Sequence, residues 1–498
     1  WPFTMILGFD DIKQKDLITT EILVIGSGAG GSLTAALLAE AGFEVLLLEA
    51  GPFLRLDETK KWSREEMELK YRNGGITPAL GRLPVAYIEG KCVGGGTEIN
   101  SGLYHQTPTE IIEEWRNGWK IDALSTDILA PYFNTIEKDL SVSSLPGTPS
   151  ALSQVLIDGA NSLDWKVLEV PRWFKYSSEK GQKAGEINGI RQSMTETYIP
   201  RLIKAGGSIL PDCSVKRLKL RGKNVYDADA ILKDKNSVKE LKIKAKEFFL
   251  CAGAIQTPFL LRKSVTKRNI GDNFQLHPTI KLTAQFPYEM NSSEVDVPVH
   301  QVKQFAPDLS FGGSISTPGY IAVAMGDNWW QWRQAIKDWQ KIGIYYAMIK
   351  PTGSGKIRTL PFSHEPFVTF KLTQKDIKNI SHGVAYLGKL LFAAGAEKLY
   401  PSIRNHTIMT KPKDCYYYLY NPVDTSRANI MSIHLFGSCP MGEDKNICAT
   451  DSFGKIHDIK NIYVNDSSLL PSAPGVNPQG SIMAIAMRNV KRFINSYR

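Results

Sequence analysis

The segment TEILVIGSGAGGSLTAALLAEAGFEVLLLEAG, residues 20–51, most constrains how this chain can fold. An apolar strand at 22–25 runs into the glycine motif GSGAGG at 26–31, an Ala/Leu-rich helix follows, and a second strand at 45–48 ends in Glu49. Such a unit places the pyrophosphate of a dinucleotide at the helix N-terminus and the ribose hydroxyls at the acidic residue. The segment therefore predicts a dinucleotide-binding βαβ unit, but the motif alone does not separate NAD from FAD.

The length of the chain, 498 residues, predicts two domains or one large composite fold. No apolar run approaches the roughly 18 residues of a membrane-spanning helix. The apolar opening WPFTMILGF, residues 1–9, is too short to span a membrane and lacks the pattern of a signal peptide. We expect it to dock on the fold, with a weak surface anchor as the alternative.

Charge and cysteine content restrict the classes of partner and metal site that the chain can have. The net charge is +10, yet the lysines are scattered, so no nucleic-acid partner is predicted, and peripheral contact with a membrane stays open. The six cysteines show neither a CxxC pair nor metal-ligand spacing. We therefore expect no metal site and reduced thiols, as in a cytoplasmic protein. The oligomeric state is not predicted.

A second glycine-rich segment follows at 90–108, GKCVGGGTEINSGLYHQTP. Three consecutive glycines leave backbone amides free to line another face of an extended ligand. A flexible linker is the alternative, but the apolar residues Val93, Ile99 and Leu103 around the glycines argue against a loop surrounded by water.

A third segment lies near the C-terminus, where a strand at 462–464 ends in Asp466 and a Pro-rich turn leads to an apolar helix. Asn477 and Pro478 stand at the expected helix start, as a good N-cap and a proline in the first turn. The simplest interpretation is that Asn477 only caps the helix.

Six motifs, in order, resemble those of the glucose-methanol-choline (GMC) oxidoreductases, and the first and last look especially like cholesterol oxidases and long-chain alcohol oxidases. They are the fingerprint at 20–51, VGGGTEIN, FFLCAGAIQTPFLL, NIGDNFQLHP, HLFGSCPMG and VNDSSLLPSAPGVNPQGSIMAIAMRN. The resemblance covers the nucleotide-binding half well and is loose over about 106–200 and 280–430.

The resemblance implies FAD, bound in an elongated conformation. In the resembled family, the first glycine motif binds the pyrophosphate, the acidic residue after the second strand binds the ribose, and a valine contacts the adenine. The second glycine loop and the start of the last helix lie beside the flavin, and an aspartate contacts the phosphate or ribityl region. The residues so implied are Gly26, Ser27, Gly28, Ala29, Gly30, Gly31, Glu49, Val93, Gly94, Gly95, Gly96, Thr97, Asn100, Val215, Asp466 and Pro478. Some members tether the flavin through a His before the Asn of the second loop. Ile99 occupies that position here, so we expect non-covalent FAD and only a packing or surface role for His105.

Alcohol oxidation needs a base close to neutrality, which histidine provides. Among eight histidines, His434 stands after an apolar strand and before a Gly-containing turn, where strands feed pockets. In the resembled family the matching histidine is the active-site base or alkoxide stabiliser, and the alternative is a core histidine. Asn477 matches the second active-site position, where an amide offers a donor and an acceptor to the substrate oxygen. We assign His434 as base and Asn477 as the residue that holds this oxygen.

The fold class implied is α/β, a Rossmann-like FAD domain with a discontinuous second domain built on an antiparallel sheet covered by helices. We place the FAD domain at 1–105, 200–280 and 430–498, and the substrate domain at 106–199 and 281–429. Alternation in TIKLTAQF, EVDVPVHQVKQF and PFVTFKLT predicts strands of that sheet, and CYYYLY is also predicted as a strand. DIKNISHGVAYLGKLLFAAGAEKLY predicts an amphipathic helix ending near Gly395.

Clustered tryptophans at 329–339 predict a lid or core segment, with membrane contact as the alternative. They favour an apolar alcohol, whether aliphatic, aromatic or sterol-like. The expected reaction is oxidation of that alcohol to an aldehyde or ketone by hydride transfer to flavin N5. A non-redox or light-driven flavin enzyme, of the hydroxynitrile lyase or photodecarboxylase type, and a flavin-binding protein without activity are the alternatives. The electron acceptor is not predicted: oxygen, a quinone and a redox protein all stay open.

Overall fold

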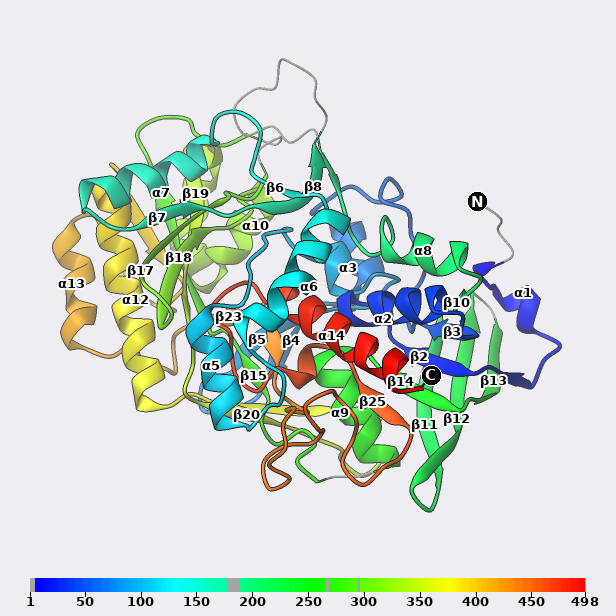
Figure 1. Ribbon diagram of the computed structural model, residues 1–498. Helices are drawn as coiled ribbons and strands as arrows, with labels where there is room; N and C mark the ends of the chain where they lie inside the picture. Colours follow the sequence, from blue (N-terminus) through cyan, green and yellow to red (C-terminus); the bar gives the residue numbers. More distant parts are fainter. Residues whose placement is uncertain (1–4, 177–188, 236, 266–267, 293–295, 498) are drawn as a thin grey trace.

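A computed structural model describes residues 5–176, 189–235, 237–265, 268–292 and 296–497. Two sheets organise the molecule: a parallel sheet on the side of the chain termini and a larger, mostly antiparallel sheet on the side of α12 and α13 (Figure 1). The expected α/β fold, with a Rossmann-like parallel sheet, is confirmed.

The parallel sheet is the scaffold for the nucleotide motif. In order its strands are β10 (Ser208–Leu210), β3 (Val45–Leu48), β2 (Ile22–Ile25), β14 (Glu247–Leu250) and β25 (Ile462–Val464). Every residue of β2 and β3 is buried, as expected for parallel strands covered on both faces. Helices α2 (Ala29–Glu40) and α14 (Gln479–Tyr497) pack against each other beside it.

The large sheet forms the opposite wall. In order it contains β4 (Tyr71–Ala79), β5 (Val85–Gly90), β23 (Ile430–Ser432), β16 (Thr279–Gln285), β19 (Ile342–Ile349), β18 (Leu309–Gly313), β17 (His300–Phe305) and β7 (Val167–Glu169), and β22 (Lys398–Pro401) also pairs with β16. Helices α12 (Gln374–Ala393) and α7 (Ala151–Ser162) pack on one face, in one hydrophobic core with Ile280 and Leu282. Thr279 and Lys281 alternate with these residues and line a cavity on the other face. The domain boundaries stay a prediction, and β4 and β5 belong to this sheet although we placed 1–105 with the FAD domain.

The strand predictions at 279–285 and 367–371 are confirmed, and α12 ends just before Gly395 as expected. In EVDVPVHQVKQF the strand β17 occupies 300–305, while 293–295 lie outside the described residues.

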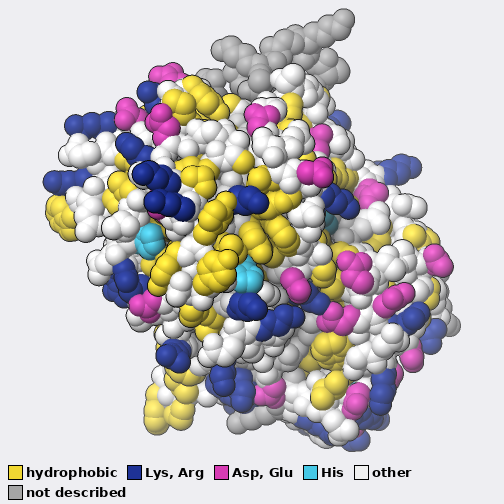
Figure 2. Space-filling model, turned by 90° about the vertical axis from the view of Figure 1, so that its left-hand side faces the viewer, with side chains coloured by type: hydrophobic (Ala, Val, Ile, Leu, Met, Phe, Trp, Pro, Cys, Tyr) yellow, Lys and Arg dark blue, Asp and Glu magenta, His cyan; other side chains and the backbone are white. Residues whose placement is uncertain are grey.

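The prediction of a strand for CYYYLY is wrong, because these residues belong to helix α13 (Pro412–Tyr420). Proline at the first helical turn and a capping box through Asp414 start the helix. Cys415 and Tyr418 are buried, three residues apart on one helical face, whereas Tyr417 and Tyr420 are exposed. Figure 2 views the molecule from the side of α13 and shows hydrophobic side chains gathered in the middle of that face, with Lys and Arg around them.

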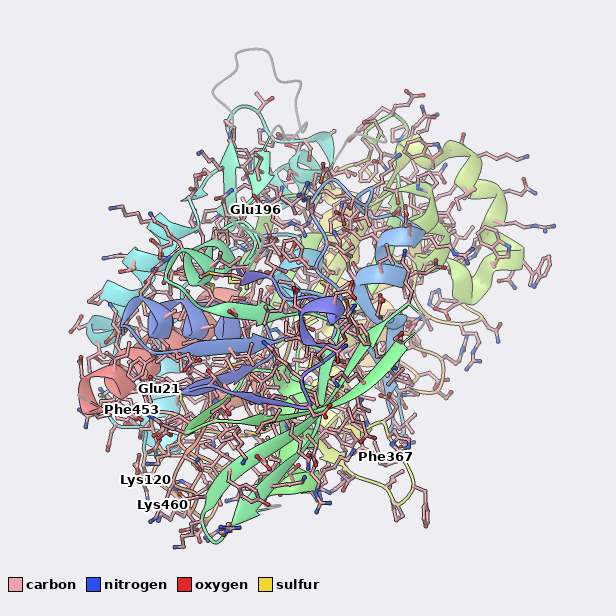
Figure 3. All side chains as sticks on the ribbon, turned by 90° about the vertical axis from the view of Figure 1, so that its right-hand side faces the viewer. Glu21, Lys120, Glu196, Phe367, Phe453 and Lys460 are labelled. Atoms are coloured by element: carbon pink, nitrogen blue, oxygen red, sulfur yellow. The ribbon has the colours of Figure 1, made fainter. Side chains whose placement is uncertain are left out.

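A four-stranded sheet of β1 (Leu17–Thr19), β13 (Ser237–Lys244), β12 (Asn224–Asp234) and β11 (Cys213–Arg221) lies on the side opposite α12 and α13 (Figure 3). Of the opening segment, Ile6 forms a bridge with Ile209 of the parallel sheet, so the described part docks on the fold, and residues 1–4 lie outside the described residues. Trp332 is buried, whereas Trp330 is 79% exposed. Nowhere in the described ranges is a helix both long and apolar enough to cross a membrane.

Candidate active site

A cavity of about 460 Å³ lies between the parallel sheet and the large sheet. Of the predicted site residues, fifteen line it: Gly26, Ser27, Gly28, Ala29, Gly30, Glu49, Gly95, Gly96, Thr97, Asn100, Val215, His434, Asp466, Asn477 and Pro478. Gly31, Val93 and Gly94 are not among the residues that line it. The structure thus brings residues from 26 to 478 together around one space.

The glycines divide into those that face the cavity and those that let the chain pack. A Cβ on Gly28 or Gly96 would meet nothing within 4 Å, so the backbone there is open to a ligand. A Cβ on Gly31 would collide with the carbonyl oxygen of Gly26, because the helix crosses the strand closely at that point. Gly26 has a φ of 99°, which favours glycine. This is the division of roles that the GxGxxG motif predicts.

Glu49 ties the first two loops together. Its Oε2 accepts hydrogen bonds from the amide and the hydroxyl of Ser27 at 3.0 and 2.7 Å, and its Oε1 accepts from the Gly51 amide at 3.0 Å. The Gly94 amide in turn donates to the Ser27 hydroxyl at 3.1 Å. Ser27 and Gly94 therefore join the first glycine turn to the second glycine loop, while Glu49 still reaches the cavity.

Two other predicted residues, Asp466 and Asn100, hold neighbouring segments. Asp466 accepts from Thr257 and from the amides of Gly253 and Ser468, at 2.6, 2.8 and 2.8 Å, which satisfies both carboxylate oxygens. Burial raises the pKa of Asp466. Asn100 donates to Gln479 at the start of α14 at 2.9 Å.

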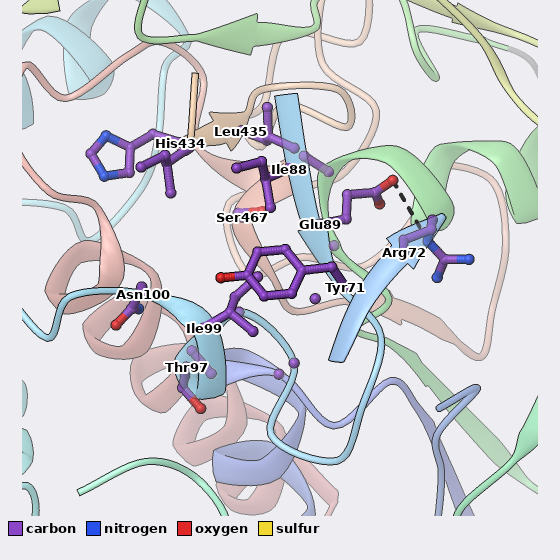
Figure 4. Close-up of a pocket in the computed structure, with 18 of the residues that line it drawn as sticks. Tyr71, Arg72, Ile88, Glu89, Thr97, Ile99, Asn100, His434, Leu435 and Ser467 are labelled. Carbon is purple, nitrogen blue, oxygen red and sulfur yellow. Dashed lines mark ion pairs between the residues drawn. The ribbon is translucent and has the colours of Figure 1, made fainter. Parts of the chain in front are cut away.

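Figure 4 shows Thr97, Ile99 and Asn100 on the short helix α4 (Gly96–Ile99) and its end, drawn around the same space as Tyr71 of β4 and His434. Arg72 and Glu89, beside Tyr71, form an ion pair at 3.6 Å. Ile99 lines the cavity, so the position of the covalent tether in some family members carries an apolar side chain here.

His434 and Asn477 meet at the cavity wall. The distance between Asn477 Nδ2 and His434 Nε2 is 3.3 Å. Helix α14 begins at Gln479, two residues after Asn477, and the Asn477 side chain bonds to His434 and Gln301. The simple capping interpretation of Asn477 is therefore wrong, because its amide faces the cavity.

His277 is one of the site residues that the sequence did not predict. It directly precedes Pro278 in the motif NIGDNFQLHP, and that position was the available signal. Strands β15 (Gln275–Leu276) and β24 (Leu435–Phe436) pair antiparallel with Leu276 opposite Leu435, which places His277 beside His434. Their Nδ1 atoms lie 3.0 Å apart. His277 Nε2 accepts a hydrogen bond from the Gly475 amide at 3.1 Å.

Both histidines of this pair are held in the neutral form. Burial, with a smaller contribution from Lys303, lowers the pKa of His434 to about 4. Burial and then His434 lower the pKa of His277 well below its usual range. Near neutral pH each imidazole therefore carries one proton.

The large sheet extends the polar network. Gln301 Nε2 lies 3.2 Å from both Asn477 Oδ1 and the Tyr346 hydroxyl. Tyr346 reaches Gln301 across Gly312, where a Cβ would collide with the hydroxyl oxygen. Lys281 lies opposite Tyr346 on the neighbouring strand and lines the cavity. Burial lowers the pKa of Lys281 to about 8.

Comparisons with known proteins identify the family and the shared fold. Two models of the GMC oxidoreductases match residues 67–279 and 353–486, and a model of the NAD(P)-binding Rossmann-like domain matches 24–63. An uncharacterised GMC-type oxidoreductase of Sinorhizobium fredii is 36% identical over 95% of this chain and 94% of its own length. The long-chain-alcohol oxidase FAO3 of Arabidopsis thaliana is 26% identical over 94% of this chain and 67% of its own. Formate oxidase of Aspergillus oryzae shares the fold, with a TM-score of 0.74, 15% identity, and coverage of 97% of this chain and 99% of its own.

The fold and the cavity define a Rossmann-type flavoenzyme. The chain belongs to the GMC oxidoreductases and is an FAD-dependent oxidoreductase. The residues present fit FAD. Gly28 and Gly96 leave open backbone on the cavity, where a ligand can approach. The close packing of this turn requires glycine at 26 and 30, because a Cβ at either position would collide with neighbouring backbone.

Proposed function

We propose that this protein oxidises an apolar alcohol to an aldehyde or ketone, with the substrate oxygen held between His434 and Asn477. The observation that carries the proposal is the 3.3 Å contact of these two side chains on the wall of the cavity lined by both glycine loops. An imidazole and an amide at one point can bind a hydroxyl oxygen and its hydrogen together.

FAD, when bound, supplies the hydride acceptor at flavin N5. We propose that its pyrophosphate is surrounded by Gly26, Ser27, Gly28, Ala29, Gly30 and Gly31. Glu49 then binds the ribose, Val215 contacts the adenine, and Asp466 lies at the phosphate or ribityl region. The loop beside the flavin consists of Val93, Gly94, Gly95, Gly96, Thr97 and Asn100. Pro478 removes one amide at the start of α14 and leaves those that follow facing the cavity. With Ile99 at the tether position, the proposal is non-covalent FAD.

Apolar side chains on the cavity lining support an apolar substrate. Leu103, Val297, Ile315, Met348 and Ile433 line the cavity. Lys281 adds a cation to this lining. The base role predicted for His434 requires a free lone pair on Nε2, the atom that faces Asn477.

The experiment that tests this function is anaerobic flavin reduction. Aliphatic, aromatic and sterol-like alcohols are mixed with the oxidised holoenzyme, and loss of the oxidised flavin absorption is followed. We expect reduction by at least one apolar alcohol, and a rate lower by orders of magnitude in Asn477→Ala with FAD still bound. No reduction across the panel would favour the non-redox or light-driven alternative. Reoxidation by air or by an artificial dye then separates an oxidase from a dehydrogenase.

A further inference from the structure

The backbone amide of Gly475 sets the direction of a chain of hydrogen bonds. A peptide N–H can only donate, so His277 Nε2, 3.1 Å away, must accept with a lone pair. A neutral imidazole carries one proton, and it must then be on His277 Nδ1. Because His277 is fully buried and its pKa is lowered by burial, the doubly protonated ring does not compete near neutral pH.

The second ring follows from the first. His277 Nδ1 faces His434 Nδ1 at 3.0 Å, and the ring planes meet at 83°. With the proton on His277 Nδ1, His434 Nδ1 must be the acceptor, since two N–H groups cannot share this contact. His434 is neutral, so its single proton is on Nε2.

We propose that Gly475 and His277 fix the tautomer of His434, so that His434 Nε2 carries a proton and meets the substrate oxygen as a hydrogen-bond donor. His277 is in this sense a positioning residue. The catalytic meaning of this inference rests on the proposed function, but the position of the proton does not depend on any substrate.

The remaining members of the network accommodate this direction. A half-turn of an amide exchanges its oxygen and nitrogen and leaves its shape unchanged. Asn477 then accepts from His434 Nε2–H through Oδ1 and donates to Gln301 through Nδ2, and Gln301 Oε1 also accepts from the Tyr346 hydroxyl. The same contacts, 3.3, 3.2 and 3.2 Å long, are all kept, and the second polar position of Gln301, which is buried without a partner among the described residues, holds nitrogen in place of oxygen. Of these groups, only the Gly475 amide has a fixed direction.

The consequence bears on the role of His434. To act as a base at Nε2, His434 would carry its proton on Nδ1, and His277 would carry its own on Nε2, where it would point at the Gly475 N–H. That arrangement leaves a buried amide without an acceptor, which is unfavourable. In the oxidised enzyme His434 is therefore held as a hydrogen-bond donor to the substrate oxygen, and a bound hydroxyl directs its own hydrogen to Asn477 Oδ1.

Neutron diffraction from deuterated, oxidised holoenzyme without substrate tests the tautomer directly. We expect deuterium on His277 Nδ1 and on His434 Nε2, and none on His434 Nδ1. Deuterium on His434 Nδ1, whether alone or together with Nε2, would overturn the proposal. Failure of the proposed function would appear in the flavin-reduction experiment and would leave this result intact.

A matched pair of variants tests the role of His277. In ¹⁵N-histidine-labelled holoenzyme, the signals of His434 are those absent from His434→Gln. His277→Gln keeps an acceptor for Gly475 and a donor for His434, so we expect the unprotonated Nδ1 signal of wild type. His277→Phe removes the donor, so we expect that signal to move toward the protonated range as both tautomers become populated. An unchanged His434 spectrum in His277→Phe, with FAD bound, would show that His277 does not set the tautomer.

Discussion

The first glycine turn at the nucleotide end and the side chains at the substrate end of the cavity differ in how far apart their partners lie along the chain. At the nucleotide end, Ser27 and Glu49 are 22 residues apart, within one βαβ unit. At the substrate end, Gln301 reaches Asn477 over 176 residues and His277 reaches His434 over 157. The first glycine turn is therefore formed within one unit, whereas the side chains of the substrate end meet only when strands distant in sequence, such as β15 and β24, come together.

The largest effect should come from the glycine turn at the nucleotide end. Gly31→Ala would drive a methyl group into the Gly26 carbonyl, so we expect little folded protein. Gly28→Ala has an allowed φ of −67° and open space in front of it. We expect that variant to fold and to lose flavin, measured as flavin content per folded protein and by circular dichroism. Equal flavin content in wild type and Gly28→Ala would show that the cofactor does not approach this backbone.

At the substrate end a side-chain change should slow chemistry without loss of flavin. We expect Asn477→Ala to reduce the rate of flavin reduction roughly 10²- to 10³-fold, the range for loss of one hydrogen-bonding group at a reacting oxygen. Because α14 starts at Gln479, the loss of helix stability should be small. Stopped-flow kinetics measure the rate of flavin reduction, and thermal melting of the holoenzyme measures its stability. A normal rate with a lower melting temperature would reduce Asn477 to a structural residue.

This contrast also explains what the sequence could predict. The GxGxxG unit, the second glycine loop and the order of the motifs were readable because each is local, and the fold class and family followed from them. Gln301 and Tyr346 have no such signal, since their contact depends on β17 lying two strands from β19 and on Gly312 leaving room between them. CYYYLY was predicted as a strand from its aromatic residues, but Pro412 and Asp414 start a helix there. His277 stood in a recognised motif, yet its partner lies 157 residues away.

A third prediction concerns His105, which belongs to the second glycine-rich segment, residues 90–108. Both its ring nitrogens are sealed from solvent and have no partner among the described residues. Burial, then Lys303 and His434, lowers its pKa to about 3. In the unfolded chain the pKa is about 6.5, so as pH falls below this value the unfolded state binds a proton that the folded state does not, and stability is lost.

Between pH 8 and pH 5 this histidine alone should cost about 2 kcal/mol of unfolding free energy. His105→Asn cannot titrate, so we expect it to lose about that much less than wild type over the same interval. Guanidinium titrations of the holoenzyme at both pH values give the difference, in which other titrating groups cancel. Equal losses in the two proteins would mean that His105 is solvated in solution.

The smallest effect tests whether Lys281 belongs to the substrate end. Lys281 and Lys303 both have a pKa lowered to about 8 by burial, but only Lys281 is among the residues that line the cavity. A charged ammonium disfavours an apolar chain beside it, so the affinity for an apolar alcohol should rise as pH increases through about 8 and Lys281 becomes neutral. We expect an increase within about tenfold, since one pH-linked charge is at issue. Lys281→Met should bind tightly at every pH and lose the dependence, whereas Lys303→Met should keep it. KM measured from pH 6.5 to 9.5 in the three proteins decides the matter: a dependence that survives in Lys281→Met would place this lysine away from the substrate.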